Sequence, residues 1–490
     1  MDNDTHRRLR IEGQPIPKQA PQVRITNWKE TFVGFDLETA QLEATRCIHC
    51  PDAPCQTACP VGNDIPGSLI LLERGDVIGA ANVFRETSNL PEMCGRLCPQ
   101  ERLCEGDCVV AYAIRPDGLE PQPPVAIGKL EAFVTDTQRQ TEGWPAPEPL
   151  PPTGHRVAVV GAGPAGLAVA EELAKKGHQV TLFDSWKEPG GVLLYGIPNF
   201  KMQKEILQEY LAHLWKMGIK FVGNTFVGRD ITIDQLFEQG YSAVFLGHGA
   251  SQGNRLEVDG VDLPGVIMAT EYLVRGNLAS DLLPEFMREP LPPVDKVLVV
   301  GGGDTSMDCV RTAVRLGAKE VTCAYRRTET EQLGRIEERK HALEEGVRFE
   351  YLAAPIKFEA GDEGKVARGY FARMALGEPD ESGRRRPVPT GEEFVVEADI
   401  IVVAIGYGGD EEVARLSSGI STDRALVKVD PETFQTTRPG VFAGGDAVNG
   451  ADLVVTALAD GRRAANAIDR YLGSLPGSQG SSIVGLTRAG

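Results

Sequence analysis

The stretch that decides the fold is residues 155–184, HRVAVVGAGPAGLAVAEELAKKGHQVTLFD. It predicts a buried strand over 157–160, a glycine-rich turn, a helix over 167–176 and a second strand over 179–183 that ends on Asp184. This order is the βαβ dinucleotide-binding fingerprint. The turn residues predicted to contact the cofactor are Gly161, Gly163, Pro164, Ala165 and Gly166. A pyrophosphate would lie at the helix N-terminus, and Asp184 could accept hydrogen bonds from a ribose hydroxyl.

A second copy of this pattern lies at residues 296–327, KVLVVGGGDTSMDCVRTAVRLGAKEVTCAYRR. Its predicted cofactor contacts are Gly301, Gly302, Gly303, Asp304 and Thr305. Where the first copy ends on an acid, this one ends on Arg326 and Arg327. An acid would repel a 2′-phosphate, whereas an arginine pair can bind it, so the second copy is predicted to bind NADPH and the first FAD. A solvated arginine pair is the alternative.

A third glycine-rich turn follows a short apolar strand at residues 441–446, VFAGGD. Gly445 and Asp446 are predicted to contact the flavin, because an aspartate at the end of a strand can bind a ribityl or pyrophosphate-linked hydroxyl. The following helix, from about Asp452, would direct its positive N-terminus at the N1/O2 edge of the flavin. An ordinary turn is the alternative for so short a motif.

The cysteines are concentrated in one segment, since eight of the ten lie between Cys47 and Cys108. Their density favours iron–sulfur clusters over zinc, because four-ligand zinc sites usually show two close CxxC-type pairs and these spacings are irregular. Eight cysteines suggest two four-iron clusters, although spacing alone does not assign each ligand. Cys309 and Cys323 lie in apolar surroundings and are predicted core residues.

The composition limits the functional classes. The chain has 490 residues, enough for two to four domains, and a formal net charge of −18. This charge disfavours nucleic acid and anionic membranes as partners and suits a basic protein face. No apolar run reaches the ~18 residues of a membrane span, and the N-terminal residues have no apolar signal-peptide core. We therefore predict a cytoplasmic protein.

Several further segments complete a resemblance that covers nearly the whole chain. They are RCIHCPDAPCQTACPVGNDIP (46–66), MCGRLCPQERLCEGDC (93–108), PVAIGKLEAF (124–133), GGVLLYGIPNFKM (190–202), VGGGDTSMD (300–308), YRRTE (325–329) and VFAGGDAVNGADLVVTALADGRRAA (441–465). Together they resemble the small (β) subunit of NADPH-dependent glutamate synthase. Relatives of that family include the large subunit of NADH-dependent reduced ferredoxin:NADP oxidoreductase and the N-terminal half of dihydropyrimidine dehydrogenase.

The resemblance implies which residues hold the clusters. One [4Fe-4S] cluster would take Cys47, Cys50, Cys55 and Cys108. The other would take Cys59, Cys98, Cys104 and Glu131, which stands where some relatives have glutamine. Cys94 would then bind neither cluster. Gly190 and Gly191 match the family's flavin-lining loop, with a plain turn as the alternative.

The resemblance also implies an α/β fold. It comprises two Rossmann-like nucleotide-binding domains of the glutathione-reductase-like kind, with a discontinuous FAD domain, preceded by an α-helical iron–sulfur domain. The predicted domains are 1–150 for the clusters, ending in a proline-rich linker, 151–285 and 406–475 for FAD, 286–405 for NADPH, and 476–490 as a flexible tail. Residues 1–40 read as an arm over another domain, and 380–390 as a solvated turn without function.

The predicted function is electron transfer between NADPH, FAD and two [4Fe-4S] clusters, with a partner subunit or ferredoxin receiving the electrons. Hydride transfer at FAD N5 needs no side-chain base, so no catalytic side chain is predicted. The protein is expected to form a hetero-oligomer. One alternative is a self-contained NADPH-dependent reductase of a small molecule, which a redox CxxC beside either fingerprint would favour. Another is a scaffold with degenerate sites, against which the intact glycines and cysteines argue.

Overall fold

The structure is a computed structural model and describes residues 3–115, 118, 120–145, 150–379, 381 and 383–475. The predicted tail, 476–490, and residues 146–149 of the predicted linker lie outside the described residues. The chain forms two compact units. The first comprises Met1–Gly143, Val192–Leu207 and Ser251–Gly408, and the second comprises Trp144–Gly191, Gln208–Ala250 and Gly409–Gly490. The domain boundaries given above remain predictions.

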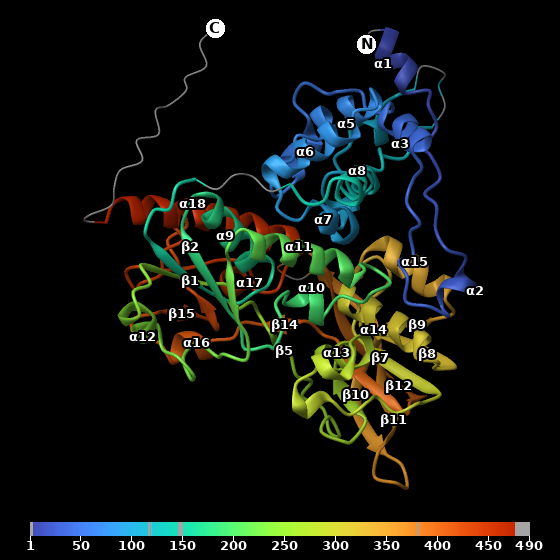
Figure 1. Ribbon diagram of the computed structural model, residues 1–490. Coiled ribbons are helices and arrows are strands. Elements are labelled where there is room, and N and C mark those ends of the chain that lie inside the picture. The colour runs from blue at the N-terminus through green and yellow to red at the C-terminus, as the bar shows by residue number, and fades with distance from the viewer. Residues whose placement is uncertain are drawn as a thin grey trace. The chain divides into compact units, whose positions relative to one another are not determined.

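The fingerprint stretch 155–184 forms the centre of the second unit. Its parallel sheet has the order β17-β4-β1-β2-β3, and β1 and β2 are labelled in Figure 1. The strands are β1 (Arg156–Val160), β2 (Gln179–Phe183), β3 (Lys220–Val222), β4 (Ala243–Leu246) and β17 (Val441–Ala443). Because β1 lies between β4 and β2 and is buried from Val157 onward, its apolar sequence has no polar alternation. The C-terminal strand β17 completes the sheet, as a discontinuous domain requires.

Helices and short strands surround this sheet. They are α9 (Pro164–Lys175), α11 (Lys204–Lys216), whose first residues belong to the other unit, α12 (Ile233–Glu238), α16 (Glu412–Arg415), α17 (Asp446–Asn449), α18 (Val454–Gly473), and strands β15 (Thr422–Asp423) and β16 (Leu426–Val427). Gly461 of α18 allows this helix to pack closely along α9, since a Cβ there would lie 2.4 Å from the Ala165 carbonyl oxygen. Within the described ranges, no helix combines the length and apolarity needed to cross a membrane.

The second fingerprint forms a similar parallel sheet in the first unit, with the order β6-β13-β7-β8-β9. Its elements are β6 (Val266–Met268), α13 (Ala269–Asn277), β7 (Lys296–Val300), α14 (Asp304–Arg315), β8 (Glu320–Tyr325), α15 (Ile336–Glu344), β9 (Arg348–Tyr351) and β13 (Ile400–Val403). Nearby lie α10 (Val192–Tyr195), two 3₁₀ turns, η3 (Ser280–Leu282) and η4 (Glu285–Met287), and the paired strands β5 (Gln252–Gly253) and β14 (Tyr407–Gly408).

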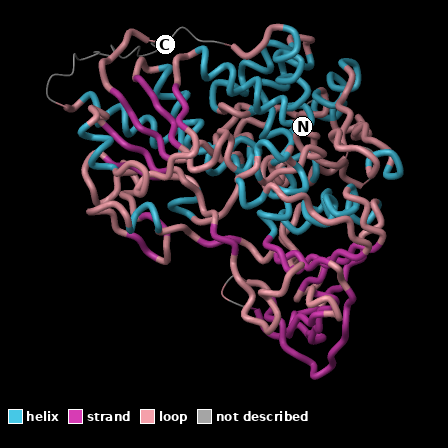
Figure 2. The backbone as a smooth tube through the Cα atoms, turned by 60° about the horizontal axis from the view of Figure 1, so that its bottom comes forward, coloured by secondary structure: helices cyan, strands magenta, loops and turns pink. Residues whose placement is uncertain are grey.

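An antiparallel sheet, which the sequence did not predict, follows β9. It consists of β10 (Ala353–Ala360), β11 (Val366–Pro379) and β12 (Arg385–Glu397), and its long hairpin is visible in Figure 2. The solvated turn predicted for 380–390 is therefore wrong from Arg385 onward. Strand β12 lies at the edge of the sheet and is mostly exposed, so it tolerates Pro387 and Pro389 and lacks a continuous apolar face.

The N-terminal part of the first unit is helical. It contains α1 (Asn3–Arg8), α2 (Pro21–Arg24), α3 (Leu37–Ala44), α4 (Pro54–Ala58), α5 (Ile65–Glu73), α6 (Val77–Thr87), α7 (Pro91–Leu97), η1 (Gln100–Arg102), η2 (Val109–Ala111) and α8 (Ile127–Thr141). Aspartates 36, 64 and 76 begin α3, α5 and α6, and each side chain accepts a hydrogen bond from a backbone N–H of the first turn. The predicted arm contacts α15, because Arg24 is fully buried and pairs with Glu344 and Glu345.

Candidate functional site

The first fingerprint turn packs tightly against the protein at two of its three glycines. Gly161 has a φ of +97°, and a Cβ there would lie 2.3 Å from the Gly247 carbonyl oxygen. A Cβ at Gly166 would lie 1.9 Å from the Gly161 carbonyl oxygen, so helix and turn pack at contact distance. By contrast, a Cβ at Gly163 meets nothing nearer than the Gly191 Cα, at 3.8 Å. The turn is therefore closed on its protein side and open at Gly163, where a cofactor would approach.

Asp184 is bonded to this turn. Its carboxylate oxygens accept hydrogen bonds from the backbone N–H groups of Ala162 (2.7 Å) and Trp186 (2.9 Å), and burial raises its pKa. The sequence predicted only a ribose contact. In the structure the same carboxylate also fixes the loop that would hold the pyrophosphate.

Two further loops of the second unit meet near this turn. The N–H of Gly190 donates to the Ala162 carbonyl (2.8 Å), and Gly191 lies against Gly163. In the third glycine-rich turn, the Gly445 N–H donates to Asp460 Oδ2 (3.0 Å), and burial raises the pKa of Asp446 to about 6. Sequence reasoning missed Asp460, because it lies inside a helix, on α18; the quoted segment 441–465 contains it, but the sequence alone gives no sign that it contacts the Gly445 turn.

The second fingerprint turn, which lies in the first unit, is built in the same way as the first fingerprint turn. A Cβ at Gly301 would lie 2.1 Å from the Ala404 carbonyl oxygen, and Gly302 lies against the Tyr325 ring. Ser306, which replaces the third glycine, donates a hydrogen bond to the same Ala404 carbonyl (3.2 Å). A Cβ at Gly303 would meet no atom of the described chain within 4 Å. Gly303 thus faces open space at the N-terminus of α14, as Gly163 does at α9.

The two arginines after β8 differ sharply. Arg326 is exposed, whereas Arg327 is only 4% exposed and its Nε donates to the Arg385 carbonyl of β12 (2.8 Å). Arg326 is therefore available to a phosphate in solvent, and Arg327 is held in the protein.

Asp304 and Thr305 begin α14. The Asp304 carboxylate accepts a hydrogen bond from the Arg335 backbone N–H (2.9 Å) and lies 3.9 Å from the Arg102 guanidinium. The Thr305 hydroxyl interacts with Tyr407, whose own hydroxyl also pairs with Thr270 at 3.0 Å. Both residues thus have protein partners at the predicted nucleotide site.

Four of the predicted cluster ligands surround one small cavity. Cys47, Cys50, Cys55 and Cys108 line a cavity of about 20 Å³. Its other walls are almost entirely apolar, with side chains such as Ile48, Ile65 and Val125. These four cysteines are the set that the resemblance implies for one cluster.

The remaining predicted ligands form a second group. Cys59, Cys98 and Cys104 all lie close enough to Glu131 for its charge to raise their pKa values. Glu131 is only 6% exposed on α8 and its Oε1 accepts a hydrogen bond from Asn63 Nδ2 (3.2 Å), so it is not a solvated helix residue. Cys94 lies in the same group, hydrogen-bonded to Cys98 and 3.8 Å from the Ser88 hydroxyl oxygen.

The thiols of both groups favour the neutral form. Burial raises the pKa of Cys47 to about 12 and the pKa values of Cys55 and Cys59 to about 11. The hydrogen bond with Cys94, followed by burial, raises the pKa of Cys98. Iron would have to displace these protons, because the ligand is the thiolate. Among the described residues, no group of three or more His, Cys, Asp or Glu side chains is already arranged to hold a single metal ion.

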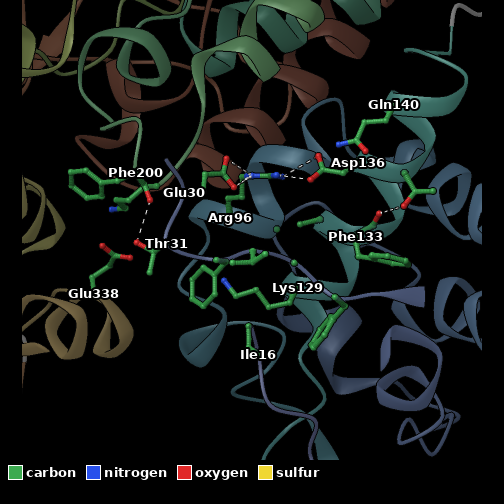
Figure 3. Close-up of a pocket in the computed structure, with 18 residues that line it drawn as sticks. Ile16, Glu30, Thr31, Arg96, Lys129, Phe133, Asp136, Gln140, Phe200 and Glu338 are labelled. Atoms are coloured by element: carbon green, nitrogen blue, oxygen red, sulfur yellow. Dashed lines mark hydrogen bonds and ion pairs between the residues drawn. The ribbon is translucent and has the colours of Figure 1, made fainter. Parts of the chain in front are cut away.

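A larger cavity of about 220 Å³ lies beside the cysteine-rich helices (Figure 3). The arm residues Glu30 to Phe35 form one wall, and α7 and α8 form another. Its charges are compensated within the chain, since Arg96 pairs with Glu30 (2.9 Å) and with Asp136 (2.5 Å), and Lys129 lies over the Phe32 ring. These contacts attach the arm to the helical module.

Comparisons with known proteins agree with this division of the chain. A family model described as dihydropyrimidine dehydrogenase domain II, 4Fe-4S cluster, matches residues 24–143, and one described as pyridine nucleotide-disulphide oxidoreductase matches 155–461. The glutamate synthase [NADPH] small chain of Escherichia coli (strain K12) is 39% identical over 480 residues, which cover 96% of this chain and 100% of that relative. The chain belongs to the glutamate synthase small-chain family.

Two further comparisons, one with a curated protein and one with a solved structure, extend this result. The putative oxidoreductase AegA of the same E. coli strain is 42% identical over 470 residues, covering 94% of this chain and 70% of AegA. Among solved structures, Mycobacterium tuberculosis FprA in complex with NADPH has a TM-score of 0.56 at 20% identity, covering 65% of this chain and 84% of FprA. The likeness to FprA shows the fold alone.

These findings confirm the predicted resemblance and the α/β fold class. They confirm that this member of the glutamate synthase small-chain family is an electron-transfer oxidoreductase with a nucleotide-binding oxidoreductase domain and an iron–sulfur domain. The number of clusters and the role of each site residue stay predictions.

Proposed function

We propose that the chain takes electrons from NADPH and delivers them, through FAD and two [4Fe-4S] clusters, to a partner subunit or ferredoxin. One observation carries this proposal: two glycine-rich turns of the fingerprint type and two groups of predicted cluster ligands occur in the same chain. When bound, FAD would convert two-electron hydride chemistry into the one-electron transfers that iron–sulfur clusters accept.

The chain's own residues would bind, orient and shield these groups. The N–H groups at the start of α9 and α14 would bind the pyrophosphates of FAD and NADPH. Asp184, Gly190, Gly191, Gly445 and Asp446 would complete the FAD site. The apolar walls around Cys47 and Cys108 would exclude water from one cluster. Cys59, Cys98, Cys104 and Glu131 would hold the other.

Selectivity for NADPH is assigned to Arg326. Its guanidinium is exposed at the end of β8, where a 2′-phosphate lies in this type of fold. We assign Arg327 a supporting role, because its contact with β12 fixes the backbone from which Arg326 projects.

The partner is proposed to be a separate protein, either a large subunit or a ferredoxin, which makes the working enzyme a hetero-oligomer. The name of the E. coli relative, a small chain, supports this. The charge of −18 suits a partner with a basic docking face. We also propose a cytoplasmic location, since all ten cysteines are free in the structure and reduced thiols are typical of that compartment.

The decisive experiment is anaerobic purification followed by a visible spectrum, an iron count and a titration with NADPH. Bound flavin with about eight iron atoms, both reduced by NADPH, is expected for two four-iron clusters. Zinc without flavin would contradict the proposal.

The same sample tests the small-molecule reductase. The two cysteines outside the cluster groups, Cys309 and Cys323, are fully buried, which is unsuited to disulfide exchange. Turnover with a ferredoxin but not with small disulfides or quinones is therefore expected. The opposite result would favour the alternative.

A further inference from the structure

Arg335 connects the second fingerprint turn to the segment that carries Cys98 and Cys104. It is 3% exposed and lies at the start of α15, nine residues after the exposed Arg326. Its backbone faces the nucleotide turn and its side chain faces the cysteine-rich helices. All of these residues belong to the first unit.

On the nucleotide side, two backbone bonds fix this residue to the turn. The Arg335 N–H donates to Asp304 Oδ1 (2.9 Å), and the neighbouring Gly334 N–H donates to the Gly302 carbonyl (3.0 Å). Residues 334–335 therefore form part of the wall of the turn where a pyrophosphate would bind.

On the cluster side, the guanidinium donates two hydrogen bonds. One goes to the Arg96 carbonyl (2.8 Å), two residues before Cys98, and the other to Gln100 Oε1 (2.9 Å). A third hydrogen bond connects the same two segments, because the Ile336 N–H donates to Glu101 Oε1 (3.1 Å).

Gln100 extends this connection to both sides of the ligand segment. Its side-chain amide donates to the carbonyls of Cys94 (3.2 Å) and Gly95 (3.1 Å). Its own carbonyl accepts from the N–H groups of Glu105 and Gly106, which follow Cys104. Arg335 and Gln100, both buried, thus hold the nucleotide turn and the ligand segment in one hydrogen-bonded network.

We propose that Arg335 is a positioning residue shared by the two sites, through which nucleotide binding at Gly301–Asp304 alters the cluster held by Cys59, Cys98, Cys104 and Glu131. This inference rests on the proposed function. A nucleotide bound at the turn adds phosphate charge beside Asp304. The rigid hydrogen-bonded network passes the resulting shift in atomic positions to the segment around Cys98. Nucleotide binding lowers the reduction potential of this cluster, because negative charge nearby disfavours an added electron. By linkage, reduction of the cluster weakens nucleotide binding by the same factor.

The test uses a probe that binds without reacting. The compound 2′-monophosphoadenosine-5′-diphosphoribose carries the phosphates of NADP but no nicotinamide, so it accepts no hydride. Its affinity is measured with the clusters of the full chain oxidised and reduced, and the EPR spectrum and midpoint potential of the clusters are recorded with and without it. We expect affinities that differ by roughly fivefold or more, with a matching fall in the midpoint of one cluster.

Three variants separate the network from a general structural effect. Arg335→Met should bind the probe with nearly equal affinity in both cluster states and abolish the probe-induced shift, whereas Arg335→Lys should restore part of it. Gln100→Glu keeps an acceptor for Arg335 but loses the donors to Cys94 and Gly95, and should also reduce the coupling. Arg339→Met is the matched control, because Arg339 lies on the same helix and contacts Glu329 instead (2.9 Å). It should retain the wild-type coupling.

The outcomes distinguish two kinds of failure. In the first, the wild type holds its clusters and binds the probe but shows no coupling between them, or the coupling is unchanged in Arg335→Met and Gln100→Glu. Either result would overturn this inference alone. A wild-type chain that binds neither the probe nor two clusters would overturn the proposed function and this inference with it.

Discussion

Arg326 and Arg327 are neighbours of the same type, yet they do different things. The sequence assigned both to a 2′-phosphate. The structure exposes Arg326 and buries Arg327 against the Arg385 carbonyl. The difference arises because successive residues at the end of a strand point to opposite sides, so Arg327 faces β12 and Arg326 faces solvent.

Removal of the exposed arginine should therefore change specificity. For Arg326→Ala, we expect the KM for NADPH to rise about tenfold to a hundredfold, with little change for NADH, since a charge-assisted bond contributes about 1.5–3 kcal/mol. Steady-state kinetics with both nucleotides measures this. Arg327→Ala should instead lower the melting temperature. Equal losses of NADPH and NADH activity in Arg326→Ala would contradict the assignment.

A glycine without neighbours offers a second test at this scale. Gly303 has open space where a Cβ would lie and an ordinary negative φ, −90°. Gly303→Ala should therefore fold and melt like the wild type, yet bind NADP more weakly because the methyl group occupies the pyrophosphate's place. Isothermal titration together with a melting curve checks both parts. Unchanged affinity would mean that the nucleotide does not approach this turn.

Cys94 tests the ligand assignment. Cys94→Ser should retain both clusters, with about eight irons, whereas Cys98→Ser should lose one. Iron analysis and EPR spectroscopy distinguish the two results. Loss of a cluster in Cys94→Ser would make Cys94 the ligand and remove Glu131 from the set.

At the scale of elements, α15 and the residue after it hold the N-terminal arm. Glu345 follows α15 and pairs with Arg24 Nε (2.7 Å), Arg311 (2.8 Å) and Arg315 (2.8 Å). No local pattern predicts this cluster, because Arg24 lies more than 300 residues from Glu345. In the sequence each of these residues resembles an ordinary surface charge, because only the folded chain brings Glu345 and the three arginines together.

This buried cluster should make the first unit sensitive to acid. Burial alone would raise the pKa of Glu345, but hydrogen bonds from Arg311 and Arg315 outweigh it and lower the pKa to about 2. Because the folded pKa lies below the ordinary value, the stabilisation is present above about pH 4.5 and is lost as the pH falls towards 2. Melting temperatures between pH 7 and 3 should fall less steeply in Glu345→Gln than in the wild type.

At pH 7, Glu345→Gln should be less stable than the wild type by about 3–5 kcal/mol, because it leaves buried arginines without their partner. Glu363→Gln is the control, since Glu363 is exposed and, within the described part of the chain, pairs with Lys365 at 3.5 Å. If both variants followed the wild-type acid profile, the Glu345 cluster would not be the acid-sensitive element.

At the scale of the whole molecule, the predicted cofactor sites are divided between the two units. The predicted FAD residues belong to the second unit, and the predicted NADPH and cluster residues belong to the first. Loss of one cofactor should therefore leave the sites of the other unit intact.

Gly166→Ala tests this division. A Cβ would lie 1.9 Å from the Gly161 carbonyl oxygen, so the first turn should no longer bind FAD. Dithionite should still reduce the clusters, and NADPH should no longer do so. Gly473→Ala is the matched control, because a Cβ at this position of α18 would meet no other described residue within 4 Å, and it should behave like the wild type. NADPH reduction of the clusters in a flavin-free Gly166→Ala would rule out FAD as the intermediate carrier.

The sequence by itself determined the two βαβ units, the closing strand at 441–443 and the cysteine-rich module, because local periodicity, glycines and cysteine spacing report on neighbouring residues. Only the tertiary structure decided that Arg326 faces solvent while Arg327 does not, that Asp460 holds the Gly445 turn, and that Glu345 gathers three arginines. Strand β12 also escaped prediction, since an exposed strand has no buried face to leave an apolar pattern. The physical reason is common to all of these cases. Contacts between residues distant in the sequence leave no local pattern, whereas a turn that binds a phosphate must be encoded by adjacent residues.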